Sequence, residues 1–250
     1  MRVVGIIPAR YSSTRFPGKP LVPINGVPMV LRVAKKVAAA LGKEHTYVAT
    51  ESELIHNVVT DAGYQAVMTS DEHLTGTDRL AEAAEKIPAH YYLNIQGDEP
   101  IINPQDILMV AELKKQYPDS IINGMSKLRE GEDPWDINIP KVLVNSSGRL
   151  LYMSRLPLPG VKSLKKEHPP VYYKQVCIYG FTLAQLRLFN SIKVKPEFEF
   201  QEDIEILRFF DFDVPVQMVE FYSSSMAVDR PEDVVAIENY LKENGDDYYI

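Results

Sequence analysis

The stretch Val3-Val-Gly-Ile-Ile-Pro-Ala-Arg-Tyr-Ser-Ser-Thr-Arg-Phe-Pro-Gly-Lys-Pro20 decides the fold class of this chain. Its apolar start predicts a buried parallel strand over 3–7 that ends in a loop at Pro8. The loop then gathers cationic and hydroxyl side chains, namely Arg10, Ser12, Ser13, Thr14, Arg15 and Lys19. A strand that feeds such a loop brings backbone N–H groups and fixed cations to the carboxyl edge of a sheet. We therefore predict a polyphosphate-binding site at this edge.

Two common phosphate-binding motifs do not fit this loop. A P-loop requires G-x-x-x-x-G-K-[ST], but Ser13 stands at the first glycine position and Pro20 at the hydroxyl position. The G-x-G-x-x-G sequence that a Rossmann dinucleotide site requires after its first strand is also missing. A solvated basic loop is the structural alternative, because runs of charge usually face water.

Short apolar stretches alternate with helix-like stretches along the first half of the chain. They predict strands at 46–50, 65–68 and 91–95, and helices at 28–41, 52–62, 77–87 and 107–116. The second half is less regular. It predicts a hairpin (141–145 with 150–153), strands at 173–181 and 216–219, helices at 199–210 and 231–242, and a surface excursion over 156–170. The alternation predicts an α/β fold in which helices flank a mostly parallel sheet.

The composition is that of an ordinary globular protein with an acidic balance. The 250 residues carry a net charge of −7, which argues against a nucleic-acid partner, because proteins that bind duplexes present a basic face. Cys177 is the only cysteine, which excludes a disulfide within the chain and a cysteine-based zinc site. The sequence shows neither a signal peptide nor an apolar run of about 18 residues. We therefore expect a cytoplasmic protein without a membrane partner.

A second polar cluster follows the strand predicted at 91–95. Gln96-Gly97-Asp98 begins where this strand ends, and ligands of open α/β sheets bind beyond the carboxyl ends of strands. Mg²⁺ is commonly held by one or two carboxylates together with substrate phosphates, so Asp98 is a candidate metal ligand. Asp229, just before the last predicted helix, is the candidate second ligand. Each carboxylate has a structural alternative, which is to stabilise the N-terminus of the helix that follows it.

The first loop resembles I-P-A-R-x-x-S-[ST]-R-x-P-x-K-P, the N-terminal signature of the 3-deoxy-manno-octulosonate cytidylyltransferases. These CMP-Kdo synthetases activate 3-deoxy-manno-octulosonate (Kdo) for lipopolysaccharide and capsule assembly. The resemblance spans nearly the whole chain and implies a single domain over 1–250 with a fold like that of the nucleotide-diphospho-sugar transferases. It implies a nucleotide-binding half at 1–125 and a half at 126–250 with a smaller, irregular β-rich lobe for sugar binding and dimerisation. It also implies Mg²⁺, CTP and a 3-deoxy-octulosonic acid as ligands, and a homodimer.

The resemblance assigns roles to residues of the first half. Arg10 and Lys19 would hold the triphosphate and stabilise the leaving pyrophosphate, while Asp98 would hold Mg²⁺. The segment from Thr69 to Arg79 resembles T-x-x-x-H-x-S-G-T-[DE]-R, which lines the base and ribose in the family. The substrate-binding residues implied for this half are Ser12, Arg15, Thr75, Gly76, Arg79 and Gln96. His73 has no second histidine or cysteine at ligand spacing, so a structural role explains it better.

The resemblance extends to the second half. Asp229 lies in a segment similar to V-D-[TR]-P-E-D, which supplies the second magnesium carboxylate in the family. Arg155 lies in a segment that matches L-Y-[FM]-S-R-x-x-[IL]-P, and its guanidinium would approach the sugar carboxylate, which suits bidentate pairing. Further substrate-binding residues implied by I-Y-G-[YF], R-H-x-G-I-Y-G and E-x-L-E-Q-L-R are Gln175, Tyr179, Glu202, Glu205 and Ile206.

Two of these positions depart from the family pattern. Gln175 stands in place of a histidine, and Ile206 in place of a glutamine. Changing two polar residues of a sugar pocket would move the preference toward a modified sugar, with an 8-amino analogue as the leading candidate. The acidic residues between Glu197 and Glu205 would suit a substrate that bears an amine, unless they form a solvated helix face.

These residues predict a cytidylyltransferase that transfers CMP from CTP to the anomeric hydroxyl of a 3-deoxy-octulosonic acid, either Kdo or 8-amino-Kdo. Another keto-sugar acid, of the sialic acid type, is an alternative substrate. A nucleotide-sugar glycosyltransferase is an alternative activity, although Asp98-Glu99-Pro100 lacks the second aspartate of D-x-D. A non-catalytic nucleotide sensor is a third, and the retention of both candidate metal carboxylates argues against it.

Overall fold

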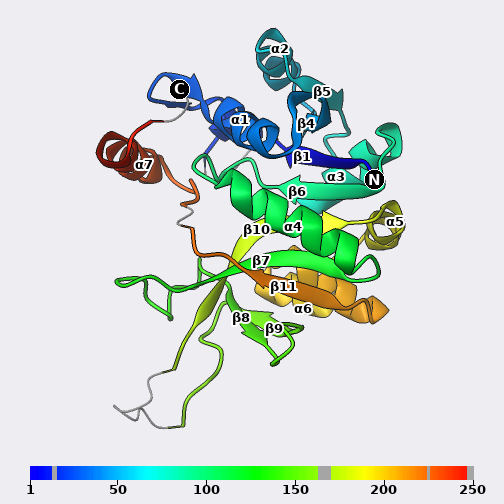
Figure 1. Cartoon of the computed structure of the whole chain (residues 1–250), viewed down its shortest axis with the longest axis vertical. Helices are drawn as coiled ribbons and strands as arrows, with labels where there is room; N and C mark the ends of the chain where they lie inside the picture. The colour runs from blue at the N-terminus through cyan, green and yellow to red at the C-terminus, as the bar shows by residue number, and fades with distance from the viewer. Residues whose placement is uncertain (13–15, 163–169, 224–225, 247–250) are drawn as a thin grey trace.

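The computed structural model of the chain describes residues 1–12, 16–162, 170–223 and 226–246. A nine-stranded sheet runs through it in the order β11-β7-β10-β6-β1-β4-β5, with β8 paired to β10 and β9 paired to β8 (Figure 1). The strands are β1 (Val3–Pro8), β4 (Thr46–Thr50), β5 (Gln65–Met68), β6 (Tyr91–Ile95), β7 (Ile121–Lys127), β8 (Lys141–Val144), β9 (Leu150–Ser154), β10 (Tyr173–Phe181) and β11 (Val216–Glu220). The seven-strand path is parallel except at β10, which runs against both of its neighbours. The predicted fold class is confirmed.

Helices cover both faces of the sheet (Figure 1). Apolar side chains of α1 (Met29–Leu41), α2 (Glu53–Asp61) and α4 (Pro104–Gln116) pack into one core cluster with residues of the strands, among them Ile7 and Leu93. On the opposite face, α3 (Gly76–Lys86), α5 (Leu183–Ser191) and the 3₁₀ segment η3 (Glu205–Phe212) pack into a second cluster that contains Ile6 and Phe181. Side chains alternate along a strand, so neighbouring strand residues such as Ile6 and Ile7 enter different cores.

The predicted helix at 199–210 is wrong in form. The structure has the short helix α6 (Glu197–Glu202) followed by η3, with a break at Asp203, whose backbone is left-handed at φ 50. An aspartate tolerates this conformation better than most residues, and Arg155 donates to the carbonyl oxygens of Glu202 and Asp203 on either side of the break. The break turns Ile204 and Ile206 into the core.

The structure contains several helices and strands that the sequence did not predict. These are α5, β7, η1 (Lys19–Leu21), η2 (Lys43–His45) and the small hairpin of β2 (Pro23–Ile24) with β3 (Val27–Pro28). The β8–β9 hairpin was predicted and is confirmed. Of the excursion expected over 156–170, residues 163–169 lie outside the described part, and Leu156 and Val161 are exposed.

The C-terminal segment returns to the first half of the chain. The last helix, α7 (Pro231–Asn244), lies beside α1 in Figure 1 and joins a third core cluster with Ile24 and Met29. Arg32, which is 3% exposed, is 2.8 Å from Asp246 in an ion pair that ties the end of this segment to α1. Ahead of the helix, the Val228 N–H donates to the Asp98 carbonyl oxygen over 2.8 Å. This docking places Asp229 beside the end of β6. Among the described residues, no helix has the length and apolar character needed to cross a membrane.

Candidate active site

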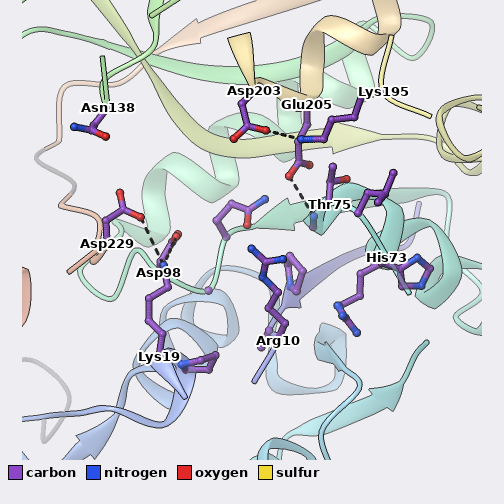
Figure 2. A pocket seen from close by; sticks show the side chains of 18 of the residues that line it. Arg10, Lys19, His73, Thr75, Asp98, Asn138, Lys195, Asp203, Glu205 and Asp229 are labelled. Carbon is purple, nitrogen blue, oxygen red and sulfur yellow. Dashed lines mark hydrogen bonds and ion pairs between the residues drawn. The ribbon is translucent and has the colours of Figure 1, made fainter. Parts of the chain in front are cut away.

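A cavity of about 670 Å³ opens at the carboxyl ends of β1 and β6 (Figure 2). One side of it, here called the strand-end wall, consists of Arg10, Lys19, Thr75, Gly76, Arg79, Gln96, Gly97 and Asp98. The other side, the loop wall, consists of Ile137, Asn138, Arg155, Lys195, Asp203 and Glu205. Asp229 lines the cavity beside Asp98. Ten residues predicted from the sequence therefore meet in one cavity.

The loop after β1 is closed by a hydrogen bond across its base. Gly18 has a left-handed backbone, with φ 69, and its N–H donates to the Tyr11 carbonyl oxygen over 2.9 Å. Glycine adopts this conformation without steric strain. The turn leads into η1, whose first residue, Lys19, enters the cavity. Ser12 is exposed and does not line the cavity, and Arg15 lies outside the described residues.

Lys19 lies between the two candidate metal carboxylates. Its Nζ is 2.9 Å from Asp98 Oδ2 and 3.8 Å from Asp229 Oδ1. It also donates to the Val228 carbonyl oxygen over 2.8 Å. The two carboxylates thus already share one positive charge, supplied by a residue of the β1 loop.

Neither carboxylate caps the helix that follows it. The N-cap of α4 is Asn103, whose side chain accepts from the Gln105 N–H. At α7, the Asp233 carboxylate accepts from the N–H groups of Asp229 and Arg230. The structural alternatives considered for Asp98 and Asp229 therefore do not explain these side chains.

The donor set fits a hard divalent cation that is bound together with a phosphate ligand. The described residues include no group of three or more acidic, histidine or cysteine side chains that could hold a metal by themselves. Mg²⁺ does not require one, because it commonly takes one or two carboxylates and completes its shell with phosphate oxygens and water. Asp98 and Asp229 supply the two carboxylates, and they lie close enough together to contact the same ammonium group.

The strand-end wall concentrates positive charge. Arg79 is 4% exposed and is held by Thr69, by the Ser70 carbonyl oxygen and by an ion pair of 3.0 Å with Glu51. Burial lowers the pKa of the Arg79 guanidinium; Glu51 opposes this shift, and the nearby charge of Arg10 adds to it. Two guanidinium groups at the same cavity make it a favourable place for an anion.

Close backbone packing and a helix cap shape the strand-end wall. A Cβ atom at Gly97 would lie 3.0 Å from the Pro8 carbonyl oxygen, so a larger residue there would require the ends of β6 and β1 to move apart slightly. At the start of α3, the Thr75 side chain accepts from the Asp78 N–H, and the Asp78 carboxylate accepts from the Thr75 N–H. This capping box sets the direction in which the helix N-terminus meets the cavity.

Glu205 joins the loop wall to the start of α3. Its carboxylate accepts from the Gly76 N–H over 3.2 Å and from the Thr77 N–H over 3.0 Å. Burial raises the pKa of the Glu205 carboxyl, while these hydrogen bonds act in the opposite direction. Glu205 was predicted as a sugar contact; it lines the cavity while it also stabilises a helix N-terminus.

Arg155 lines the cavity, but its guanidinium is largely engaged by the backbone. Its three nitrogens donate to the carbonyl oxygens of Glu202, Ile137 and Asp203, over 2.5, 2.7 and 3.0 Å. The Glu202 carboxylate accepts in turn from the Arg155 N–H over 2.8 Å. Arg155 therefore joins three connecting segments of the loop wall, and Glu202 supports it from outside the cavity lining.

The structure does not bring the other three predicted sugar-side residues to the cavity lining. Ile206 is 1% exposed within the core, and Tyr179 is 4% exposed and stacks on Phe181 with ring centroids 6.0 Å apart. Gln175 donates to Asn123 Oδ1 over 3.1 Å and to the Tyr179 hydroxyl over 3.2 Å. Gln175 and Tyr179 belong to β10, whereas Ile206 belongs to η3.

The chain is similar to cytidylyltransferases over most of its length. Residues 4–218 match the family model described as cytidylyltransferase. A 3-deoxy-manno-octulosonate cytidylyltransferase of Zea mays is 35% identical over 96% of this chain and 81% of its own length. The chain belongs to the 3-deoxy-manno-octulosonate cytidylyltransferase family. An 8-amino-3,8-dideoxy-manno-octulosonate cytidylyltransferase of Shewanella amazonensis is 34% identical over 97% of this chain and 99% of its own length.

A solved structure supports the same conclusion. A CMP:2-keto-3-deoxy-manno-octonic acid synthetase in complex with CTP superimposes with a TM-score of 0.89 at 30% identity, and covers 98% of this chain and 100% of its own. Together with the sequence relatives, it makes this cytidylyltransferase a CTP-dependent enzyme of the nucleotidyltransferase class. The relative named for Kdo and the relative named for its 8-amino analogue differ by only one percentage point in their identity to this chain. Overall identity therefore does not indicate which of the two sugar acids this enzyme uses.

Sequence reasoning missed several lining residues of this cytidylyltransferase. Those on the loop wall are Ile137, Asn138 and Lys195, whereas Asp203 was included in the acidic stretch that would suit an amine. Lys195 and Asp203 flank α6 and form an ion pair. Ile137, Asn138 and Lys195 lie on connections that carry no strand or helix pattern, so the acidic stretch around Asp203 was the only signal for this wall. His73, expected to be structural, lies at the cavity with its Nε2 2.7 Å from Glu82.

Proposed function

We propose that this cytidylyltransferase transfers CMP from CTP to the anomeric hydroxyl of a 3-deoxy-octulosonic acid and releases pyrophosphate. The observation that carries the proposal is the strand-end wall, where Arg10, Lys19 and Arg79 lie in the same cavity as Asp98 and Asp229. Such an arrangement suits a triphosphate with a divalent cation. The named substrates of the family members with 34–35% identity support the choice of sugar acid.

The protein contributes mainly by positioning and charge in this reaction. The anomeric oxygen attacks the α-phosphorus, the bond to the β-phosphate oxygen breaks, and the hydroxyl proton passes to solvent or a nearby base. Arg10 and Lys19 would stabilise the negative charge that develops on the pyrophosphate. Asp98 and Asp229 would hold Mg²⁺, which when bound would neutralise phosphate charge and acidify the attacking hydroxyl.

The structure reduces the number of acidic residues that could contact an amine on the substrate. Of the acidic side chains between 197 and 205, Glu199 is buried against Arg208 at 2.6 Å, and Glu202 supports Arg155. Asp203 and Glu205 are the acidic residues of this stretch that line the cavity. The proposal therefore includes both Kdo and 8-amino-Kdo, with Asp203 as the observation that favours the second. A homodimer and a cytoplasmic location also belong to the proposal.

The test measures pyrophosphate release with CTP and Mg²⁺ while the sugar acid is varied. Kdo, 8-amino-Kdo and a sialic acid are compared, with Asp98→Asn as the control for background hydrolysis. We expect release with at least one octulosonic acid and little with sialic acid. Pyrophosphate release only with sialic acid would show that the substrate is a keto-sugar acid of the sialic acid type and not an octulosonic acid. Release with none of the three sugars would contradict the proposed function.

A further inference from the structure

We propose that Lys195 and Asp203 form a subsite for the end of the sugar acid remote from its reacting carbon, and that Asp203 there favours an amine over a hydroxyl. This inference rests on the proposed function, because it concerns the sugar substrate of that reaction. It adds Lys195, which the sequence did not indicate, and it gives a specific role to Asp203, which the sequence indicated only as part of an acidic stretch.

The location of the pair is the first observation. Both residues line the cavity, and Lys195 Nζ forms an ion pair with Asp203 Oδ1. Figure 2 shows this pair across the cavity from Lys19, Asp98 and Asp229. The reacting anomeric carbon belongs beside the phosphates and their metal ligands. Arg155, which was predicted to meet the carboxylate on that carbon, instead donates from its guanidinium nitrogens to backbone carbonyl oxygens. The other end of the sugar chain is therefore the part that extends toward the loop wall.

The backbone of Asp203 is held firmly although its side chain is exposed. Arg155 donates to the carbonyl oxygens of Glu202 and Asp203, the residues at the break between α6 and η3. Arg155 Nη2 also lies 4.0 Å from Asp203 Oδ2. The Asp203 side chain is nevertheless 69% exposed. A fixed backbone with an accessible carboxylate is what a recognition group requires, because little ordering remains to be done on binding.

The pair is not needed to hold α6 in place. That helix is anchored by the buried Glu199, whose carboxylate accepts from Arg208 Nε over 2.6 Å and from Nη2 over 2.7 Å. Partly exposed ion pairs such as Lys195–Asp203 contribute little to stability. Glu202 and Glu205 are each engaged by backbone N–H groups. Among these acidic residues, Asp203 is the one that forms an ion pair with a lysine of the cavity lining.

The chemistry of the pair distinguishes an amine from a hydroxyl. A hydroxyl can accept from Lys195 and donate to Asp203 without disturbing their ion pair. An ammonium group pairs with the Asp203 carboxylate and displaces the Lys195 ammonium, which repels it. Asp203 therefore favours the amino sugar, and Lys195 opposes it. The two residues together set the ratio of kcat/KM for the two sugars.

The test compares this ratio in the full-length enzyme and its variants. The ratio of kcat/KM for 8-amino-Kdo to that for Kdo is measured by CTP-dependent pyrophosphate release. We expect Asp203→Asn to lower the ratio about tenfold or more, and Lys195→Met to raise it, while KM for CTP stays unchanged. The control is Glu197→Gln, which removes the same charge from an exposed side chain of α6 outside the cavity lining and should leave the ratio unchanged.

The outcomes separate this inference from the proposed function. Pyrophosphate release with an unchanged ratio in folded Asp203→Asn and Lys195→Met would overturn the subsite and leave the reaction standing. A wild-type enzyme that releases no pyrophosphate with either sugar would overturn both. If Asp203→Asn does not fold, Lys195→Met decides by itself, because a ratio that does not rise would contradict the repulsion that the subsite requires.

Discussion

The strand-end wall and the loop wall of the cavity are built in different ways. The strand-end wall takes its shape from the ends of β1 and β6 and from the N-terminus of α3, with Gly97 packed against the Pro8 carbonyl oxygen. The loop wall is assembled from connections that side chains hold together, above all Arg155 with its three carbonyl partners. A sheet edge leaves little freedom for variation, whereas side-chain contacts between loops can change. This difference suggests that the reaction depends on the first wall and the choice of sugar on the second.

The largest effect is expected from the metal carboxylates beside the strand-end wall. Asp98→Asn or Asp229→Asn should lower kcat by about 10²–10³-fold, because each removes a charge that would hold Mg²⁺ at the triphosphate. Pyrophosphate release at saturating Mg²⁺ measures the effect, and circular dichroism checks the fold. The control, Glu53→Gln on the exposed surface of α2, should retain full activity. Full activity in either aspartate variant would remove that residue from the metal site.

A smaller effect is expected from the cations of the strand-end wall. Arg10→Ala should weaken CTP binding about tenfold or more, because a hydrogen bond to a charged group contributes about 1.5–3 kcal/mol. Arg10→Glu should be worse, since it adds repulsion to the lost contact. Calorimetry with CTP measures the affinity, and the exposed Lys127→Ala serves as the control for net charge. Unchanged CTP affinity and turnover in both Arg10 variants would make the loop a solvated basic surface.

Ile206 tests where the loop wall ends, because it follows the lining residue Glu205 in the sequence but does not line the cavity itself. Because this side chain is 1% exposed in the core, Ile206→Gln should lower the free energy of unfolding by about 1–3 kcal/mol, the cost of burying an unpaired amide. It should leave the kcat/KM ratio of the two sugars unchanged. Urea denaturation and sugar kinetics measure the two quantities. A changed ratio at unchanged stability would show that position 206 faces the substrate.

The smallest effect on stability is expected at Asp203. Asp203→Asn removes a partly exposed ion pair, and such pairs contribute about 0–1 kcal/mol. Its melting temperature should therefore match that of the wild type within a few degrees, even though its choice of sugar changes. A large loss of stability would mean that the Lys195–Asp203 pair holds the loop wall together instead of recognising the substrate.

The difference between the two walls also explains which site residues could be predicted from the sequence. Arg10 and Asp98 were placed correctly at one cavity because each follows an apolar strand, and parallel strands end at the same edge. Gln175 and Tyr179 lie on β10, whose register with β7 shifts between Val176 and Tyr179. Such a shift changes which face a side chain occupies, and residue types do not reveal it. Ile206 follows the break at Asp203, which rotates it away from its position on a continuous helix.

The most direct test of the central claim follows the α-phosphate of CTP. The enzyme is incubated with CTP labelled at that phosphate, Mg²⁺ and an octulosonic acid, and the products are separated by chromatography. The account predicts that the label appears in a CMP-sugar, in an amount equal to the pyrophosphate released, and that Asp98→Asn forms almost none. Label recovered only as free CMP, or a product that forms without the sugar acid, would contradict it.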